Sequence, residues 1–344
     1  MDNTNLTTVP EPPVEGKSFG IKKSQWKLNF GVINLIVFEK VPKDKVPLDL
    51  LLLADPEKNI IEKYLNGSVF IAAKNDDTIV GITAIKKIDK QSIEIVNLAV
   101  NEKWQNKKIG RKLLEEAIIY AKTERYKQVI VRTGNSSIRQ ISLYQKLGFR
   151  ITNVNKDYFL DNYTYVIYEK NIQCRDQVEL EYRIYPEEQL EKIIKDYWNT
   201  FIEINPQYKD RKYEVWSFGY GNYQANYLLS LVRQNIKSGT SSALELYEEN
   251  EKVPEQNDIS IVTYGDGLPG CIIETVEIKI KKFDEINEYE ALLEGEGDFS
   301  LEMWRNVHQN FFTKEYLEMG KEFHNKIPVI YERFTIVYDQ NRKL

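Results

Sequence analysis

Ile95-Val-Asn-Leu-Ala-Val100, followed by Gln105-Asn-Lys-Lys-Ile-Gly110, is the stretch that decides the fold of the first half of the chain. The first segment is apolar on both faces, as the central strand of a sheet is. The second is basic and polar, and it leads into residues 111–122, where apolar side chains recur at helical spacing. The order predicts a strand, a turn and a helix, with free backbone N–H groups at the helix N-terminus.

The predicted turn has the properties of an anion site. Free N–H groups and the helix dipole bind phosphate, and Lys107, Lys108 and Arg111 add positive charge. A solvated basic turn that only caps the helix is the alternative interpretation of the same residues.

Strands and helices alternate around this centre, which predicts an α/β domain. Helices are expected at 49–53, 59–65, 111–122 and 138–147, the last closed by Gly148. Strands are expected at 34–39, 68–73, 79–88, 93–100, 128–132 and 164–168.

These residues resemble the GNAT superfamily of N-acetyltransferases. Gln105 and Gly110 match the family's pyrophosphate loop, Gln/Arg-x-x-Gly-x-Gly/Ala, whereas Lys108 stands at the first glycine position. A lysine there still offers its N–H, but it takes a left-handed conformation only at a cost. Gly134-Asn-Ser-Ser-Ile138 and Leu143-Tyr-Gln-Lys-Leu-Gly-Phe149 add to the match, which implies a GNAT domain of mixed sheet and flanking helices over residues 30–176. The start of the chain is polar and contains three prolines, so residues 1–29 are expected to be a flexible lead-in.

The resemblance implies acetyl-CoA as co-substrate. Leu98 and Val100 would hydrogen-bond the pantetheine arm, and the loop would bind the pyrophosphate. The implied cofactor-binding residues are Leu98, Ala99, Val100, Gln105, Asn106, Lys107, Lys108, Ile109, Gly110, Arg111, Ser137 and Tyr144.

The implied reaction is direct acetyl transfer to an amine, which must be neutral to attack. Glu94 is the candidate base, with an ordinary solvent-facing carboxylate as the alternative. Tyr144 matches the family's general-acid tyrosine, and a phenol with a pKa of about 10 can supply the proton that the leaving thiolate needs. An amphipathic core tyrosine is the alternative for Tyr144.

The second half of the chain differs in charge and pattern. The net charge of the whole chain is −5, yet residues 1–174 carry an excess of basic residues and residues 175–344 an excess of acidic ones. A basic first half suits an anionic ligand, and an acidic second half argues against a broad nucleic-acid-coating surface. Helices at 187–201, 223–235, 300–312 and 313–323 and strands at 259–264, 271–280 and 329–338 predict an α+β domain.

Residues from about 179 to 338 resemble the ASCH domain, a β-barrel-like fold related to RNA-associated PUA domains, and the domain is expected to span residues 177–344. The resemblance implies a nucleoside or RNA ligand and rests on several segments: Trp216-Ser-Phe-Gly219, Ala225-Asn226, Lys237-Ser-Gly-Thr240, Gly265-Asp-Gly267, Cys271-Ile-Ile-Glu274, Glu294-Gly-Glu-Gly-Asp298 and Pro328-Val-Ile-Tyr-Glu-Arg-Phe334.

Some ASCH proteins hydrolyse the acetyl amide of N4-acetylcytidine. By resemblance, Lys237 would be a desolvated base and Thr240 the nucleophile, with Glu294 as the acid and Glu274 as its rival. The alternatives are a solvated lysine and an acidic turn formed by Glu294 and Glu296. Trp216, Phe218 and Tyr220 would stack on a base or lie in the core.

Composition narrows the chemistry. The chain has two cysteines, far apart in sequence, which fits a reducing cytoplasm. The two cysteines and the two histidines show no metal-ligand spacing. No apolar run reaches the roughly 18 residues that a membrane helix needs. We therefore expect no metal and no membrane partner, and an acceptor that is a small-molecule or peptide amine. Three hypotheses stay open: an acetyltransferase with a substrate-recognising ASCH domain, a fusion of two enzymes, and a non-catalytic scaffold that binds RNA.

Overall fold

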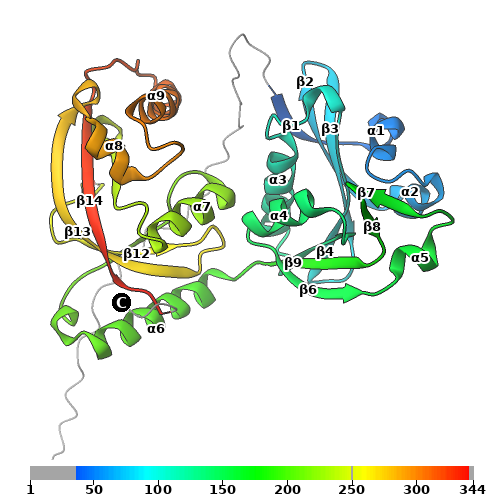
Figure 1. Ribbon diagram of the computed structural model, residues 1–344, viewed down its shortest axis with the longest axis horizontal. Helices are drawn as coiled ribbons and strands as arrows, with labels where there is room; N and C mark the ends of the chain where they lie inside the picture. The colour runs from blue at the N-terminus through cyan, green and yellow to red at the C-terminus, as the bar shows by residue number, and fades with distance from the viewer. Residues whose placement is uncertain (1–35, 249–250, 341–344) are drawn as a thin grey trace, which may run out of the picture. The chain divides into compact units, whose positions relative to one another are not determined.

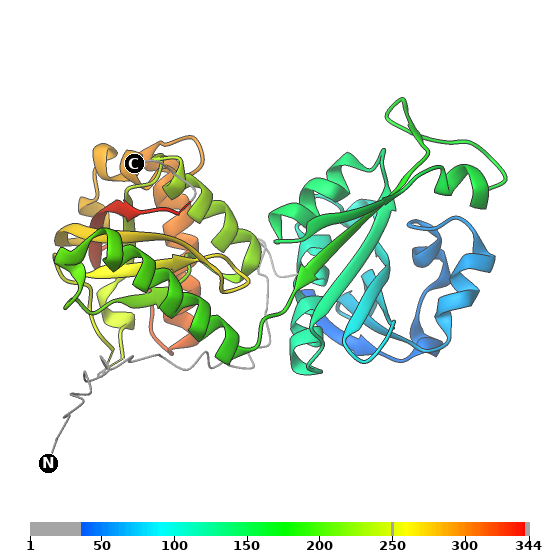
Figure 2. The same ribbon diagram turned by 90° about the horizontal axis from the view of Figure 1, so that it is seen from below.

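The computed structural model describes residues 36–248 and 251–340, which form two compact units (Figures 1 and 2). The first holds residues 36–189 together with 220–226, and the second holds 190–219 together with 227–340. The predicted lead-in at residues 1–29 and the first two residues of the strand predicted at 34–39 lie outside the described residues. Among the residues described, no helix combines the length and the apolar character that crossing a bilayer requires.

A seven-stranded mixed sheet organises the first unit, with the strand order β1-β2-β3-β4-β5-β9-β6. Only the central pair, β4 and β5, is parallel among these neighbours. The strands are β1 (Ile36–Val41), β2 (Ser68–Asn75), β3 (Thr78–Lys87), β4 (Ser92–Val100), β5 (Gln128–Gly134), β6 (Arg150–Asn155) and β9 (Gln177–Arg183).

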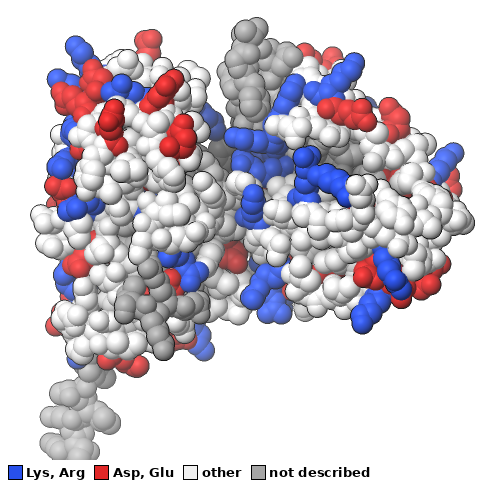
Figure 3. Space-filling model, in the orientation of Figure 1, with Lys and Arg blue, Asp and Glu red and all other residues white. Residues whose placement is uncertain are grey.

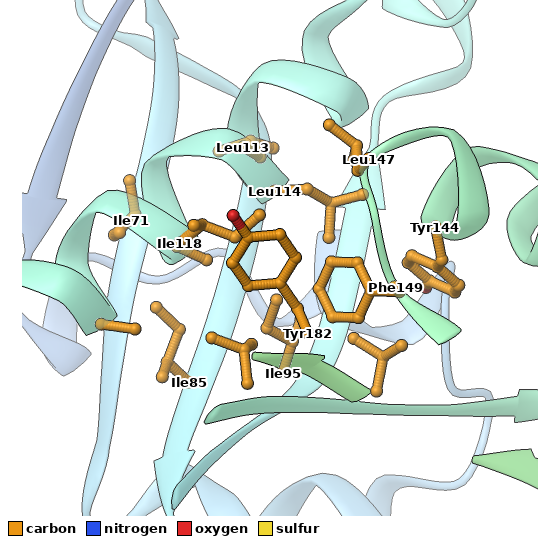
Figure 4. Close-up of a cluster of buried hydrophobic side chains, with 14 of the residues drawn as sticks. Ile71, Ile85, Ile95, Leu113, Leu114, Ile118, Tyr144, Leu147, Phe149 and Tyr182 are labelled. Carbon is orange, nitrogen blue, oxygen red and sulfur yellow. The ribbon is translucent and has the colours of Figure 1, made fainter. Parts of the chain in front are cut away.

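Helices cover both faces of this sheet because its inner strands β2 and β3 carry runs of consecutive buried residues, which point to both sides. On one face, α3 (Ile109–Thr123) and α4 (Ile138–Lys146) bury Leu113, Leu114 and Ile118 against Ile95 of the sheet (Figure 4). On the other face, α1 (Leu48–Leu52) and α2 (Lys58–Leu65) pack on a separate cluster. The predicted α/β arrangement, a mixed sheet flanked by helices, is confirmed.

The end of the first unit differs from the expectation. The strand predicted at 164–168 is a short hairpin of β7 (Ile167–Glu169) and β8 (Ile172–Cys174), preceded by α5 (Tyr158–Asn162). β9 lies beyond the predicted boundary at residues 176–177, yet it pairs with β5 and β6. The first sheet therefore extends to Arg183, because β9 fills the position between those two strands.

The second unit is α+β, as expected. Its five-stranded sheet has the order β10-β12-β13-β14-β11, and all neighbours are antiparallel except β10 and β12. The strands are β10 (Glu214–Trp216), β11 (Gly239–Ala243), β12 (Ile259–Thr263), β13 (Pro269–Lys282) and β14 (Pro328–Tyr338).

The α-helices described in this half of the chain are α6 (Glu187–Ile204), α7 (Gly221–Arg233), α8 (Glu288–Glu294) and α9 (Leu301–Glu318). The two helices predicted at 300–312 and 313–323 are the single helix α9, since no glycine or proline separates them. Trp304, Phe312 and Tyr316 of α9 pack on Val329 and Tyr331 of β14. This contact holds α9 against the sheet beside α8.

Candidate functional site

The central strands of the first sheet separate part-way along their length. β4 and β5 are paired from Ser92 with Gln128 to Ile95 with Val131, and no pairing continues beyond that point. β4 nevertheless runs on to Val100, and β5 runs on to Gly134. Residues 96–100 therefore present a strand edge to the gap between the two strands, where an extended ligand can form backbone hydrogen bonds.

A β-bulge lies at the start of this gap. The register between β3 and β4 shifts between Ala84 and Ile85, which leaves Val96 as the extra residue. A bulge bends its strand and turns side chains to new directions. Ile95 packs on the α3 side of the sheet, whereas Val96 and Ala99 pack on the α1–α2 side.

The predicted phosphate loop stands at the N-terminus of α3. A short 3-10 turn, Glu102–Trp104, follows β4, and α3 begins at Ile109. Within the described part of the chain, no acceptor takes a hydrogen bond from the backbone N–H groups of residues 108–111. These four groups are the free donors that every α-helix leaves at its start. Basic side chains also gather over the part of the unit where α3 and α4 lie (Figure 3).

Lys108 is the residue that stands at the first glycine position of the loop pattern. It caps α3 in the left-handed region, with φ at 63° and ψ at 6°. Asn106 is also left-handed, with φ at 61°. The loop thus keeps the shape that a glycine would take, and the lysine side chain is accommodated at a conformational cost of about 1 kcal/mol.

The other loop side chains have defined contacts. Gln105 donates from Nε2 to the Val100 carbonyl at 3.1 Å, which ties the loop to the end of β4. The Lys107 ammonium lies 4.3 Å from the centre of the Trp104 ring. Arg111 lies 3.6 Å from Glu115, one helical turn further on. A Cβ at Gly110 would meet only Val100 Cγ2, at 3.7 Å, so the fold itself leaves room there.

Tyr144 and Ser137 stand on α4. Tyr144 is buried against Phe149, with 5.8 Å between ring centres (Figure 4). Burial raises the pKa of Tyr144 to about 12, so its phenol keeps its proton throughout the neutral range. Ser137 precedes α4, and its hydroxyl donates to Glu169 at 2.8 Å. Ser137 therefore has a partner within the protein, and its contact with a cofactor stays a prediction.

Glu94 is engaged in an ion-pair network across three strands. Arg132 of β5 contacts Glu94 of β4 at 2.6 Å and Glu179 of β9 at 2.7 Å. The side chain of Glu94 is mostly buried, which differs from a strand-end carboxylate facing solvent. Arg132 occupies one of its oxygens, so a role as base would use the other oxygen or a water, and that role stays a prediction.

The second unit brings two of its predicted residues together. Lys237 and Glu294 are both almost fully buried, with 3.3 Å between Nζ and Oε2. Glu296 also contacts the Lys237 ammonium, at 2.8 Å. The rival carboxylate, Glu274, instead accepts a hydrogen bond from Tyr208 at 2.9 Å. The interpretation of Lys237 as a solvated lysine is therefore wrong.

The ion pairs also oppose the proposed basicity of Lys237. Burial alone would lower its pKa, but the charges of Glu294 and Glu296 outweigh burial and raise the pKa above its ordinary value. Burial alone would raise the pKa of Glu294, yet Lys237 and then His308 bring it well below its ordinary value. The described structure thus holds a protonated lysine rather than the neutral amine that a base requires.

The hydroxyl beside Glu294 belongs to Ser241. It donates to Glu294 Oε1 at 2.6 Å, and the Trp304 indole donates to the same oxygen at 2.7 Å. Thr240 is the adjacent residue of β11, where it pairs with Glu332 of β14. Because successive strand residues point to opposite faces, Thr240 faces away from the Lys237–Glu294 pair.

A pocket of about 250 Å³ opens beside this cluster. It is lined by one acidic residue, aromatic rings and apolar side chains of the second unit. His308 stacks on Trp304, with 4.2 Å between ring centres, and its Nε2 lies 3.5 Å from Glu294 Oε2. Of the predicted stacking residues, Phe218 is a buried core residue, Trp216 packs on that core, and Tyr220 is exposed.

Comparison with known proteins assigns both units. The profile of the Acetyltransferase (GNAT) family matches residues 43–149, and the profile of the ASCH domain matches residues 214–338. The N-acetyltransferase YvbK of Bacillus subtilis is 46% identical over 132 residues, which cover 38% of this chain and 85% of YvbK. The chain belongs to the GNAT acetyltransferase family. Its second half is an ASCH domain.

Further relatives cover parts of the chain. Human N-acetyltransferase 8 is 26% identical over 112 residues, which cover 30% of this chain and 49% of that protein. A GNAT acetyltransferase of Elizabethkingia anophelis with acetyl-CoA bound is 42% identical, covering 43% of this chain and 98% of that one at a TM-score of 0.42. An ASCH domain from Lactobacillus crispatus is 30% identical, covering 44% of this chain and 96% of that one at a TM-score of 0.41.

Sequence reasoning missed three members of the ASCH cluster: Ser241, Trp304 and His308. Trp304 and His308 are one helical turn apart on α9, a spacing that places both side chains on one face. That spacing was available in the sequence. Their approach to Glu294, which ends α8, depends on how the two helices pack.

Proposed function

We propose that the GNAT domain transfers the acetyl group of acetyl-CoA directly to an amine. One observation carries the proposal: no acceptor among the described residues takes a hydrogen bond from the backbone N–H groups of residues 108–111 at the start of α3. Just before this helix, residues 96–100 of β4 are not paired with β5. The helix start suits a diphosphate, and the free strand edge suits an amide-bearing arm. The strand edge belongs to β4 and the helix start to α3, which follows β4 along the chain. The hydrogen bond from Gln105 to the Val100 carbonyl ties the loop between them to the end of β4.

The proposed step uses few protein groups. The neutral amine nitrogen attacks the thioester carbonyl carbon, a C–N bond forms and the C–S bond breaks. Tyr144, which stays protonated at neutral pH, gives its proton to the leaving thiolate. The proton released by the amine passes to water or to Glu94, and solvent then reprotonates Tyr144.

A charge at Gly110 tests the phosphate site. An aspartate there should be tolerated by the fold, because the new Cβ meets only Val100 at an ordinary distance and an acid favours a helix N-terminus. It should nevertheless weaken the binding of coenzyme A by about tenfold or more through repulsion of the diphosphate. Gly110→Ala adds the same Cβ without the charge and should bind normally. Calorimetry that finds equal affinity for Gly110→Asp and Gly110→Ala would overturn the assignment.

The general acid has its own test. Tyr144→Phe should lower kcat by about 100-fold, within the range of general-acid contributions, and leave coenzyme A affinity unchanged. Tyr126→Phe removes a phenol outside the proposed site and should leave both quantities unchanged. Unaltered kcat in Tyr144→Phe would remove Tyr144 from the mechanism.

We propose as a second function that the ASCH domain binds a nucleoside-type ligand in the pocket beside Trp304. The stacked Trp304 and His308 rings offer a flat apolar wall, and Glu296 offers acceptors for an exocyclic amine. Amide hydrolysis in this pocket is a less favoured alternative, because Lys237 is held protonated. Titration with cytidine and N4-acetylcytidine, monitored by tryptophan fluorescence, separates ligand recognition from amide hydrolysis. Binding without release of acetate supports recognition. Release of acetate that Lys237→Ala abolishes supports hydrolysis. No response to either compound rejects both.

A further inference from the structure

A buried asparagine stands where β4 begins to separate from β5. Asn97 follows Val96, the extra residue of the bulge, and only 5% of its surface is exposed. Asparagine is depleted in strands because its short amide competes with the backbone for hydrogen bonds. Its position at the start of the unpaired segment, residues 96–100, indicates that the amide itself is needed there.

The side chain of Asn97 ties β4 to the helices on one face of the sheet. Its Nδ2 donates to the Leu51 carbonyl of α1 at 3.0 Å and to the Tyr64 hydroxyl of α2 at 2.9 Å. Both hydrogens of the amide nitrogen are therefore used. Because the pairing of β4 with β5 ends at Ile95, these two bonds replace part of the support that β5 gives to the earlier residues of β4.

The backbone of Asn97 is held from the other face of the sheet. Thr83 of β3 is fully buried and donates from Oγ1 to the Asn97 carbonyl at 3.1 Å. Alternate residues of a strand share a face, and Gly81, two residues before Thr83, packs on α3. Thr83 therefore approaches from the α3 side, whereas the Asn97 amide points to α1 and α2. The segment after the bulge is fastened on both faces at a single residue.

Stability alone does not account for this amide. Asn97 Oδ1 is buried and has no hydrogen-bond partner among the described residues, which costs folding free energy. The Leu51 carbonyl also accepts the backbone N–H groups of Ala54 and Asp55, so it is satisfied without Asn97. An apolar pair in place of Asn97 and Tyr64 would avoid the unsatisfied oxygen. What the asparagine adds is a fixed position for β4.

We propose that Asn97 is a positioning residue for acetyl transfer. By fastening β4 directly after the bulge, it holds the unpaired edge at residues 96–100 in place for the pantetheine arm of coenzyme A. An edge that is already ordered loses less conformational entropy when the arm binds, so more of the interaction free energy appears as affinity. Asn97 acts through β4 and needs no contact with the ligand. This inference rests on the proposed acetyl transfer and adds the residue that orders the strand edge.

Two ligands separate this role from a general loss of structure. Coenzyme A is expected to occupy both the loop at the start of α3 and the strand edge, whereas 3′-phospho-ADP, which is coenzyme A without its pantetheine arm, reaches only the loop. In the double variant Asn97→Leu/Tyr64→Phe, the Kd for coenzyme A should rise about tenfold, because the strand edge must be ordered on binding. The Kd for 3′-phospho-ADP should stay unchanged. Calorimetry measures both.

Ser92→Ala is the matched control. Ser92 is a buried polar residue in the paired part of the same strand, where its hydroxyl accepts a hydrogen bond from Gln128 at 2.9 Å. This variant should leave both Kd values unchanged. Hydrogen exchange of the ligand-free chain should be faster in peptides that contain residues 96–100 of the double variant and unaltered in the control. Thermal unfolding shows that both variants are folded.

Each other outcome has one meaning. An unchanged Kd for coenzyme A in the folded double variant overturns the positioning role and leaves acetyl transfer in place. Equal weakening of both ligands also overturns it, because the loss then belongs to the whole domain. If the double variant does not fold, Thr83→Val replaces it, since this change removes only the hydroxyl that holds the Asn97 carbonyl. A raised Kd for coenzyme A alone then supports the role, and an unchanged Kd overturns it. A wild-type chain that binds neither ligand overturns the proposed function as well.

Discussion

Single residues decide the conformation of the phosphate loop. Lys108 caps α3 at φ 63°, where a side chain carries a steric cost that glycine does not. In the pyrophosphate-loop pattern of the family, glycine stands at the position of Lys108. The protein therefore keeps the loop geometry and bears the strain of a lysine in it.

Lys108→Gly should stabilise the GNAT domain. Relief of the left-handed strain, less the larger entropy of glycine in the unfolded chain, should raise the free energy of unfolding by about 0.5–1 kcal/mol. Lys107→Gly is the control: Lys107 has no positive φ and stacks on Trp104, so this change should destabilise. Denaturant unfolding of the full chain compares them, and a loss of stability in Lys108→Gly would contradict the strain argument.

The buried pair of Lys237 and Glu294 should control the stability of the ASCH domain. The pKa of Glu294 is lowered in the folded state, so its contribution is present above the unfolded pKa of about 4.5 and is lost as pH falls through the folded pKa. The pKa of Lys237 is raised, so its contribution is present below about 10.5 and is lost as pH rises further. Between these limits the pair stays charged.

Lys237→Met should therefore cost about 3–5 kcal/mol at neutral pH, because two carboxylates lose their buried counter-ion. The double variant Lys237→Met/Glu294→Gln should recover part of this loss and lose the acid-dependent decline that the pair causes. Thermal unfolding from pH 3 to pH 7 checks both expectations. A single variant as stable as the wild type would show that the pair is dispensable.

At the scale of elements, the gap between β4 and β5 places an unpaired strand edge next to the start of α3 in the GNAT domain. The bulge at Val96 comes directly after the last paired residue, Ile95, so the bend and the separation coincide. In the part of the chain that the structure describes, the edge of β4 that faces β5 at residues 96–100 and the start of α3 both keep unpaired backbone groups. Ligand binding should satisfy both sets together.

Hydrogen exchange should report this coupling. Acetyl-CoA should slow exchange in peptides that contain residues 96–100 and 105–112, since their free N–H groups gain acceptors. The long strand pair of β13 and β14 serves as the control, with no change expected. Protection confined to the loop, with none in β4, would reject the strand as the site of the pantetheine arm.

At the scale of the whole molecule, two units with separate cores share one chain. The GNAT unit has its clusters on the two faces of the seven-stranded sheet, and the ASCH unit has its own around the five-stranded sheet. The excess of basic residues lies in the first half and the excess of acidic residues in the second. We expect the two units to respond to different ligands.

Calorimetry of the full chain tests this division. Coenzyme A at 100 times its Kd should stabilise the GNAT unit by about 2.7 kcal/mol and leave the unfolding of the ASCH unit in place. Two transitions, of which only one shifts, are the expected result. An equal shift of both would show that the units unfold together.

The sequence by itself determined the two families and the order of strand, turn and helix around residues 92–123, because these depend on local spacing and on contiguous motifs. Gln105 to Arg111 needs only a strand before it and a helix after it to become a helix-start anion site. Lys237 and Glu294 were also predicted by resemblance to belong to one site, and the structure brings them together as an ion pair.

Only the tertiary structure decided the protonation of Lys237, the choice of Ser241 over Thr240, the network of Glu94 and the place of β9. Each of these depends on contacts between residues that are distant in the sequence. Lys237 is protonated because two carboxylates from the end of α8 and the turn after it reach it in the interior. The strand β9 joins the first sheet because it pairs with β5 on one side and with β6 on the other, and no local sequence pattern predicts that pairing.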